Sequence, residues 1–229
     1  MKHMPIAKQG FPFILFFAVL TVLAALLTGI SLLAGLLFLL TLFVVFFFRD
    51  PERSVPEDED LIISPADGKL IQIREIPDNH ILGCPGVQLS IFMSLFNVHV
   101  NRMPFKGHIL KKTYNPGTFL PAFREKASLL NEQTSLLMDT RGGQVRMTQI
   151  AGQVARRIVC WAEEGDTLGK GERFGLIRFG SRVDLFLPLK NTVVIGKVGD
   201  RVKAGESALA RFSSLSETDG SAGDNNKKG

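Results

Sequence analysis

The chain has 229 residues and a formal net charge of +5 at pH 7, a length that allows one or two domains. Its two cysteines, Cys84 and Cys160, lack metal-ligand spacing and are too few for a disulfide framework, so we expect reduced thiols in a cytosolic domain. The four histidines are scattered, and no carboxylate cluster resembles a calcium loop. These observations argue against a metal centre.

The N-terminal segment explains a mean hydropathy of +0.17, which is high for a soluble protein. No charged residue occurs from Gly10 to Phe48, and a membrane-spanning helix needs about 20 apolar residues. The run is too long for a signal peptide, and residues 46–51 do not resemble a cleavage site. We expect residues 1–50 to be a membrane anchor, a helical hairpin of roughly 12–28 and 31–48; one long span is the alternative.

Positive charges flank this anchor on both sides. Lys2 and Lys8 precede it, and Arg49 and Arg53 follow it. Because cytoplasmic flanks of membrane helices are rich in Lys and Arg, a hairpin with both ends in the cytoplasm fits this pattern. With a single span, the flanks would give no clear orientation.

The rest of the chain divides into a linker, a domain and a tail. Residues 51–60 are a polar, proline-containing linker, residues 61–212 are the expected globular domain, and residues 213–229 form an expected disordered tail. Only Pro121–Lys126 favours a helical turn, whereas strand-like runs separated by turn residues dominate. The expected strands are Lys69–Glu75, Val87–Met93, His108–Tyr114, Ser135–Asp139, Val145–Ile150, Arg157–Ala162, Phe174–Phe179, Arg182–Leu187 and Thr192–Val198.

An internal repeat of turns refines the fold class. Residues 164–172 and 198–206 both follow the pattern Gly-Asp-x-apolar-x-x-Gly-Glu, in which glycine suits positive-φ turns and aspartate caps the turn backbone. Such paired turns resemble the barrel-sandwich hybrid of biotinyl and lipoyl carriers. We therefore expect a mainly β, mainly antiparallel, barrel-sandwich-hybrid-like domain with few short helices, behind the N-terminal α-helical membrane hairpin.

The dipeptide Gly180-Ser181 is the most informative local feature. Apolar, strand-like residues flank it on both sides, and glycine inside a strand often marks close backbone approach. A serine hydroxyl beside a flexible glycine carbonyl is able to attack its own preceding peptide bond. The pair is therefore a candidate site of self-cleavage, and a tight packing position is the alternative.

Two further residues have both structural and chemical interpretations. Asp67 precedes Gly68, and Asp-Gly is a strong turn dipeptide. His99 lies in the run Asn97-Val98-His99-Val100-Asn101, where it is either a structural strand residue or a general acid/base, since histidine titrates near neutral pH.

Taken together in chain order, the motifs resemble those of phosphatidylserine decarboxylase proenzymes of the short bacterial and archaeal type. The resemblance runs from about residue 10 to 212. The matching segments are Phe47–Arg53, Ser64–Gly68, Asn97–Arg102, Tyr114–Gly117, Lys126–Ser128, Asn131-Glu132 and Phe179–Asp184.

One position departs from the pattern of longer relatives, which carry two histidines as His-x-x-His-Met-Pro. Here His99 holds the first position and Arg102 the second. Arginine does not act as a base at neutral pH. Either His99 performs both histidine roles, or another group assists maturation; His108 is a candidate helper.

The resemblance implies that the chain cuts itself. Asp67 would orient His99, and His99 would deprotonate Ser181, whose oxygen attacks the Gly180 carbonyl. Elimination would then release residues 1–180 as the β chain and leave residues 181–229 as the α chain. Position 181 would pass through dehydroalanine and lose ammonia to become a covalent pyruvoyl cofactor, and the two chains would stay associated in one sheet.

The resemblance also implies the second reaction. The pyruvoyl group would form a Schiff base with the amine of phosphatidylserine and accept electrons as CO2 leaves, with His99 as proton donor to the product, phosphatidylethanolamine. Neither metal nor diffusible cofactor is needed. Further candidates for substrate or membrane-surface contacts are Arg102, Tyr114, Asn115, Lys126 and Asn131.

The expected surroundings follow from a substrate that stays in the bilayer. A bacterial or archaeal cell membrane is the expected location, with the catalytic domain on the cytoplasmic side and a homo-oligomer possible. Basic side chains suit an anionic leaflet, and no segment resembles a nucleic-acid-binding module. The basic residues in question are Arg102, Lys106, Lys111, Lys112, Arg124 and Lys126.

Two alternative functions remain at this stage. One is a pyruvoyl decarboxylase of another, soluble amine substrate, which the long uncharged anchor disfavours. The other is a membrane-tethered barrel-sandwich adaptor without enzymatic activity.

Overall fold

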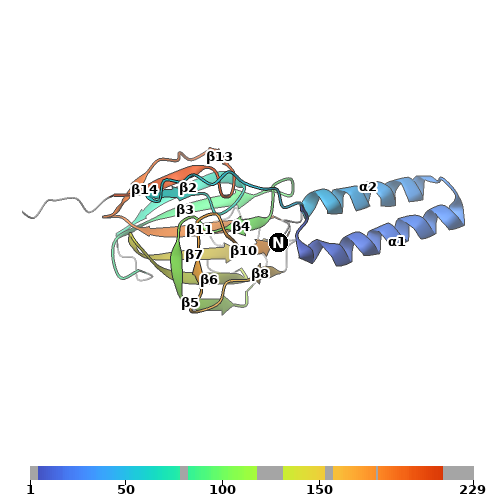
Figure 1. Cartoon of the computed structure of the whole chain (residues 1–229). Helices are drawn as coiled ribbons and strands as arrows, with labels where there is room; N and C mark the ends of the chain where they lie inside the picture. Colours follow the sequence, from blue (N-terminus) through green and yellow to red (C-terminus); the bar gives the residue numbers. More distant parts are fainter. Residues whose placement is uncertain (1–4, 78–81, 118–130, 153–156, 179, 214–229) are drawn as a thin grey trace, which may run out of the picture.

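Two apolar helices and a β domain make up the structure, a computed structural model that describes residues 5–77, 82–117, 131–152, 157–178 and 180–213. After a short 3-10 turn, η1 (Lys8–Gly10), α1 spans Phe11–Thr28 and α2 spans Leu32–Phe47. Gly29 ends α1 with φ +68°, and the Ser31 hydroxyl caps α2 by accepting a hydrogen bond from the Ala34 amide. Figure 1 shows the two helices side by side, projecting from one end of the β domain.

The β domain is built from antiparallel strand pairs throughout the described part of the chain. The large sheet has the order β13-β2-β3-β11-β7-β6-β5-β9, and two small sheets have the orders β1-β14-β12 and β4-β10-β8. The strands are β1 (Leu61–Ile63), β2 (Gly68–Ile76), β3 (Gly86–Met93), β4 (Val100–Arg102), β5 (Gly107–Asn115), β6 (Gln133–Thr140), β7 (Gly143–Ile150), β8 (Ile158–Cys160), β9 (Thr167–Leu168), β10 (Arg173–Ile177), β11 (Ser181–Pro188), β12 (Thr192–Val194), β13 (Arg201–Val202) and β14 (Ala208–Phe212).

Apolar side chains from all three sheets fill one continuous core. Alternate residues of the central strands, such as Ile91 in β3 and Val183 in β11, are fully buried there beside Phe174 from β10. A second, smaller cluster joins the helices to the domain. In it Phe47 and Phe48 pack with Val100 and neighbouring apolar residues, so the helical hairpin is seated on the β domain by hydrophobic contact.

The expected hairpin and the mainly β, antiparallel fold are confirmed. The longer expected strands are present within about two residues, but the strand expected at Phe174–Phe179 ends at Ile177, and that expected at Thr192–Val198 ends at Val194. The short strands β1, β4, β9, β13 and β14 were not expected. The helical turn expected at Pro121–Lys126 and the tail beyond Ser213 lie outside the described residues.

Among the described residues, one helix is long enough to cross a membrane, namely α1 together with η1. The segment Lys8–Thr28 has a mean hydropathy of 2.5 and is long and apolar enough to cross a membrane, and α2 is a shorter apolar helix. Most α1 side chains do not pack against the rest of the protein and are exposed. This pattern favours membrane association for the hairpin.

Candidate active site

Segments far apart in the sequence meet at the end of the large sheet from which the helices project. A single row of paired residues crosses six strands at this end. From β5 to β2 the row is Asn115, Gln133, Ile150, Arg182, Phe92 and Lys69. The motifs around residues 67–69, 114–117, 131–132 and 180–184 are therefore brought together by the strand register.

Gly180 lies in the bend before β11, and Ser181 is the first residue of that strand, so the pair stands at a strand start and not in the strand interior considered from the sequence. Gly180 has φ +65°, the left-handed conformation that glycine adopts without steric cost. A Cβ at this position would meet no atom within 4 Å, so the backbone conformation is what calls for glycine here. Ser181 itself is fully buried and pairs with Met93 of β3.

A chain of polar contacts leads from Ser181 into the domain. The Ser181 hydroxyl donates to the Met93 sulfur at 3.4 Å, and the Asn101 amide nitrogen approaches the same sulfur at 3.7 Å. The Asn101 oxygen accepts a hydrogen bond of 2.8 Å from Gln149 Nε2. Because a thioether sulfur only accepts, this arrangement sets the orientation of both amides and leaves Gln149 Oε1 buried without a partner among the described residues.

Gly175 in β10 makes room for this chain. A Cβ there would lie 2.6 Å from Gln149 Nε2 and 2.5 Å from the Val159 carbonyl oxygen. A larger residue at position 175 would therefore collide with the Gln149 amide and with the Val159 carbonyl of β8.

His99 is fully buried immediately before β4, against the end of the helical hairpin. Its ring centroid lies 4.2 Å from that of Phe47, and its Nδ1 lies 2.9 Å from the Asn97 carbonyl oxygen. Since a carbonyl only accepts, Nδ1 carries the proton, and Nε2 is left as an acceptor with no partner among the described residues. Burial lowers the His99 pKa to about 4, opposed by the Asn97 hydrogen bond and aided by the charge of Arg49.

His99 and Ser181 are connected through two neighbours. Asn101, two residues after His99 and so on the same side of an extended segment, reaches the sulfur that Ser181 contacts. The His99 carbonyl accepts from the Ile177 amide at 3.4 Å, four residues before Ser181. The structure thus brings a neutral imidazole to the same end of the sheet as the buried serine.

Asp67 has a different partner from the one expected. Both of its carboxylate oxygens lie 3.0 Å from Arg53 Nη2, and Oδ1 also accepts from the Ala204 amide at 2.8 Å. Among the contacts of the described residues, His99 is oriented by Asn97 instead. A part for Asp67 in maturation stays a prediction, and its pairing with His99 is not formed here.

Arg102 is not a membrane-surface residue, and that prediction is wrong. It is 5% exposed, donates to the Gly171 and Pro51 carbonyls, and forms a salt bridge of 3.1 Å with Asp50. Asp50 also pairs with Arg173 at 2.7 Å. At this position the chain thus has a buried ion pair that ties the end of the anchor to the β domain.

The other site candidates lie near the same end of the sheet. Tyr114 is exposed, and its hydroxyl lies 3.3 Å from a Glu132 oxygen. Asn115 ends β5 in the row that includes Arg182. Asn131 is buried and donates to the Ala151 carbonyl, so it is not on the surface. Lys126 lies outside the described residues, and a substrate role for Tyr114 and Asn115 stays a prediction.

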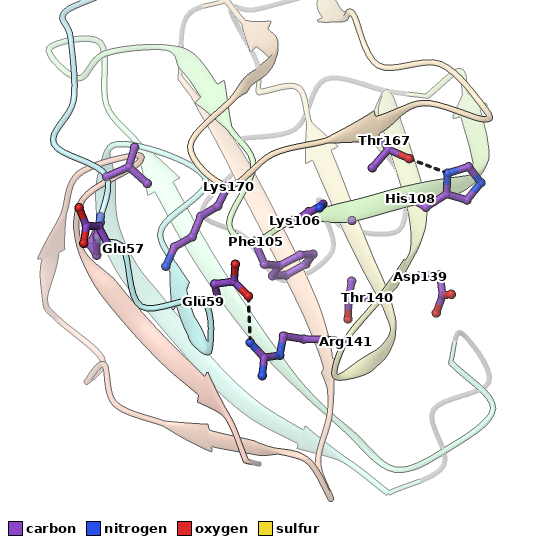
Figure 2. Close-up of a pocket in the computed structure, with 13 residues that line it drawn as sticks. Glu57, Glu59, Phe105, Lys106, His108, Asp139, Thr140, Arg141, Thr167 and Lys170 are labelled. Atoms are coloured by element: carbon purple, nitrogen blue, oxygen red, sulfur yellow. Dashed lines mark hydrogen bonds and ion pairs between the residues drawn. The ribbon is translucent and has the colours of Figure 1, made fainter. Parts of the chain in front are cut away.

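His108 lies too far away to assist Ser181. It pairs with Asp139, six residues along β6 from Gln133 at the Ser181 end, which corresponds to about 20 Å. There it lies 3.0 Å from the Thr167 hydroxyl on the edge of a cavity of about 750 Å³ (Figure 2). Lys106, expected at the lipid surface, is exposed and lines this cavity too; its contact with lipid stays a prediction.

Sequence reasoning missed the residues that surround the serine and histidine. Met93 and Gln149 carried no motif, and their place follows from strand register alone. Asn101 did carry a signal: it follows His99 by two residues, which places these two side chains on one side of an extended segment, whereas Asn97 acts on His99 through its backbone carbonyl.

Comparison with known proteins agrees with this assembly of motifs. The phosphatidylserine decarboxylase family pattern matches residues 40–210. A phosphatidylserine decarboxylase proenzyme of Syntrophus aciditrophicus is 51% identical over 93% of this chain and 100% of its own length. Proenzymes of the same name from Geotalea uraniireducens and Pelobacter propionicus are 46% and 44% identical over 91% and 92% of this chain and 97% and 98% of their own lengths. The chain belongs to the phosphatidylserine decarboxylase family and is, as a member of it, a decarboxylase made as a proenzyme.

Proposed function

We propose that this protein cuts itself between Gly180 and Ser181 and then converts phosphatidylserine to phosphatidylethanolamine and CO2 at a membrane. The observation that carries the proposal is a fully buried Ser181 directly after a left-handed Gly180, at the end of the sheet that holds His99. Membership of a proenzyme family supports self-processing, because a proenzyme needs a cut to become active.

His99 acts as the base in this proposal. A buried imidazole with a pKa of about 4 is neutral at physiological pH, and its Nδ1–H is held by Asn97, so the Nε2 lone pair is free to accept the Ser181 proton. Ser181 Oγ then attacks the Gly180 carbonyl carbon, and the peptide bond becomes an ester. Elimination of the Gly180 carboxylate leaves dehydroalanine at position 181, which takes up water and releases ammonia.

The surroundings of Ser181 fit the resulting pyruvoyl group. The group has no more heavy atoms than the serine it replaces, so it needs no new space in a fully buried position. Among the described residues, the side chain that the Ser181 hydroxyl bonds to is the uncharged Met93. A pyruvoyl group supplies an electrophilic carbonyl and an electron sink for the electrons left by CO2. His99, close to this end of the sheet, supplies or removes the proton.

The anchor explains how the site meets its substrate. A diacyl lipid stays in the bilayer, and the site lies at the end of the β domain on which the apolar hairpin is seated. We place this domain on the cytoplasmic side of a cell membrane because basic residues flank both ends of the hairpin.

Intact-mass spectrometry of protein purified from cells tests the cut. Wild-type protein should give two fragments, the smaller without a free amino terminus, and Ser181→Ala should give a single 25.2 kDa species. A single uncut species from wild type that also releases no CO2 from phosphatidylserine would overturn the proposal.

Two histidine variants test the base. His99→Ala should stop or strongly slow the cut, whereas His108→Ala, which alters a distant exposed histidine, should mature normally. Normal maturation and decarboxylation by His99→Ala would show that another group is the base.

A further inference from the structure

We propose that Arg178, together with Arg157, binds the phosphodiester of the lipid headgroup and thereby selects phosphorylated over phosphate-free serine substrates. The inference rests on the proposed function and adds to it a residue that recognises the substrate. It concerns two arginines that neither the self-cleavage nor the proton transfer described above employs.

The position of Arg178 is the first reason. It lies between the end of β10 and the Gly180 bend, three residues before Ser181. Its guanidinium carbon is 5.1 Å from the centroid of the Phe13 ring in α1. This side chain therefore lies where the scissile segment meets the base of the membrane hairpin, at which a lipid headgroup would arrive.

The absence of a counter-charge is the second reason. Within the described parts of the chain, neither Arg178 nor Arg157 forms a salt bridge. The Arg178 amide approaches the Arg157 carbonyl at 3.4 Å, so the fold holds two cations near each other. Arg178 Nε is buried with no hydrogen-bond partner among these residues, and both burial and the charge of Arg157 lower the Arg178 pKa. An anion bound between the two guanidinium groups would accept a hydrogen bond from Arg178 Nε and would reduce the repulsion between the two positive charges.

The chemistry of the substrate decides which anion fits. The serine headgroup carries a carboxylate and a phosphodiester. A strong bond to the carboxylate would stabilise the ground state more than the transition state, because that charge disappears as CO2 leaves. A bond to the phosphodiester is unaffected by the reaction. Guanidinium groups also match the fork of phosphate oxygens.

Other nearby basic residues fit less well. Arg49 already donates to the Phe46 and Phe96 carbonyls at 2.8 and 2.7 Å, and its guanidinium stacks on the Phe46 ring. Arg102 is committed to Asp50. The described contacts of Arg178 and Arg157 thus leave both side chains able to bind a ligand anion.

Two soluble substrates separate phosphate recognition from catalysis. Glycerophosphoserine carries the phosphodiester, and O-methylserine lacks it. For Arg178→Gln we expect the KM for glycerophosphoserine and for phosphatidylserine in mixed micelles to rise about tenfold to a hundredfold, the range for a lost charge-assisted hydrogen bond. The kcat/KM for O-methylserine should not change. Lys190→Gln removes an exposed charge at the far end of β11 and serves as the matched control.

Three further measurements keep the outcome clear. Intact mass establishes that each variant has matured and folded, and Arg178→Lys should recover part of the lost affinity. Binding of glycerophosphoserine, followed by phosphorus NMR, should weaken in Arg178→Gln by a similar factor even if wild type releases no CO2. The inference is overturned if Arg178→Gln binds glycerophosphoserine like wild type, or if both soluble substrates lose the same factor; absence of CO2 release by wild type would instead contradict the proposed function.

Discussion

At the scale of single residues, His99 shows how burial adapts a common side chain to one chemical role. In water a histidine exchanges between tautomers and is partly protonated near neutral pH. Here the Asn97 carbonyl selects the Nδ1–H tautomer, and burial against Phe47 disfavours the charged form. Nε2 is left as a base that is ready at every physiological pH.

We expect nitrogen NMR of the uncut Ser181→Ala protein in detergent to show a neutral His99 from pH 8 down to pH 5. Its protonation midpoint should lie near pH 4 instead of the ordinary 6.5. Because this pKa is lower in the folded state than in the unfolded state, the free energy of unfolding should be highest above pH 6.5. It should fall as the pH drops from 6.5 toward 4. A midpoint near 6.5, or protonation of Nε2 instead of Nδ1, would contradict this assignment.

At the scale of elements, β10 depends on a glycine that admits a polar side chain from another sheet. Gly175→Ala would force a Cβ to within 2.6 Å of Gln149 Nε2 and 2.5 Å of the Val159 carbonyl. Overpacking of this kind costs about 1–3 kcal/mol.

We therefore expect Gly175→Ala to lower the Tm in detergent by several degrees and to slow self-cleavage, since Gln149 supports Asn101 beside the Ser181 site. Gly107→Ala in β5 is the control, because its Cβ would meet no atom closer than 3.4 Å. Equal Tm values for the two variants would show that Gln149 is not held in this way.

Part of this arrangement could be predicted from the sequence. The helices and long strands followed from apolar length and from runs between turn residues, whereas β9 and β13 are two residues long and leave no periodic signal. Ser181 and His99 stood out through ordered motifs. The partners of Asp67 and Arg102 could not be predicted, because tertiary structure decides which distant segments form an ion pair. Asp67 binds Arg53, and Arg102 binds Asp50.

At the scale of the whole molecule, the Asp50 carboxylate connects the anchor to the domain. It lies just after α2 and pairs with Arg102 of β4 and Arg173 of β10. Because these charges are largely buried, removal of the carboxylate leaves two arginines without full compensation, a change that costs about 3–5 kcal/mol for buried pairs.

Asp50→Asn should accordingly lower the Tm of the detergent-solubilised protein much more than Glu57→Gln, which removes an exposed carboxylate from the linker that follows Asp50. Differential scanning calorimetry measures both. A Tm of Asp50→Asn equal to that of Glu57→Gln would mean that the ion pairs contribute no net stability.

Self-cleavage would leave the smaller fragment, residues 181–229, within the sheets of the larger one. β11 lies between β3 and β7, β13 pairs with β2, and β14 pairs with β1. Just after the cut, the Arg182 guanidinium is fully buried and bonds to Asp184 and to Ser90 of β3. Loss of the fragment would therefore break backbone pairing on both sides of β11 and expose a buried ion pair.

We expect the two fragments of the wild-type protein to elute together from a size-exclusion column in mild detergent, at the position of uncut Ser181→Ala. They should separate only in denaturant, because the cut removes one peptide bond at a bend and none of the strand pairs. Mass spectrometry of each fraction identifies the fragments. Elution of residues 181–229 on their own in mild detergent would show that the continuous chain, and not the sheet, holds β11 in place.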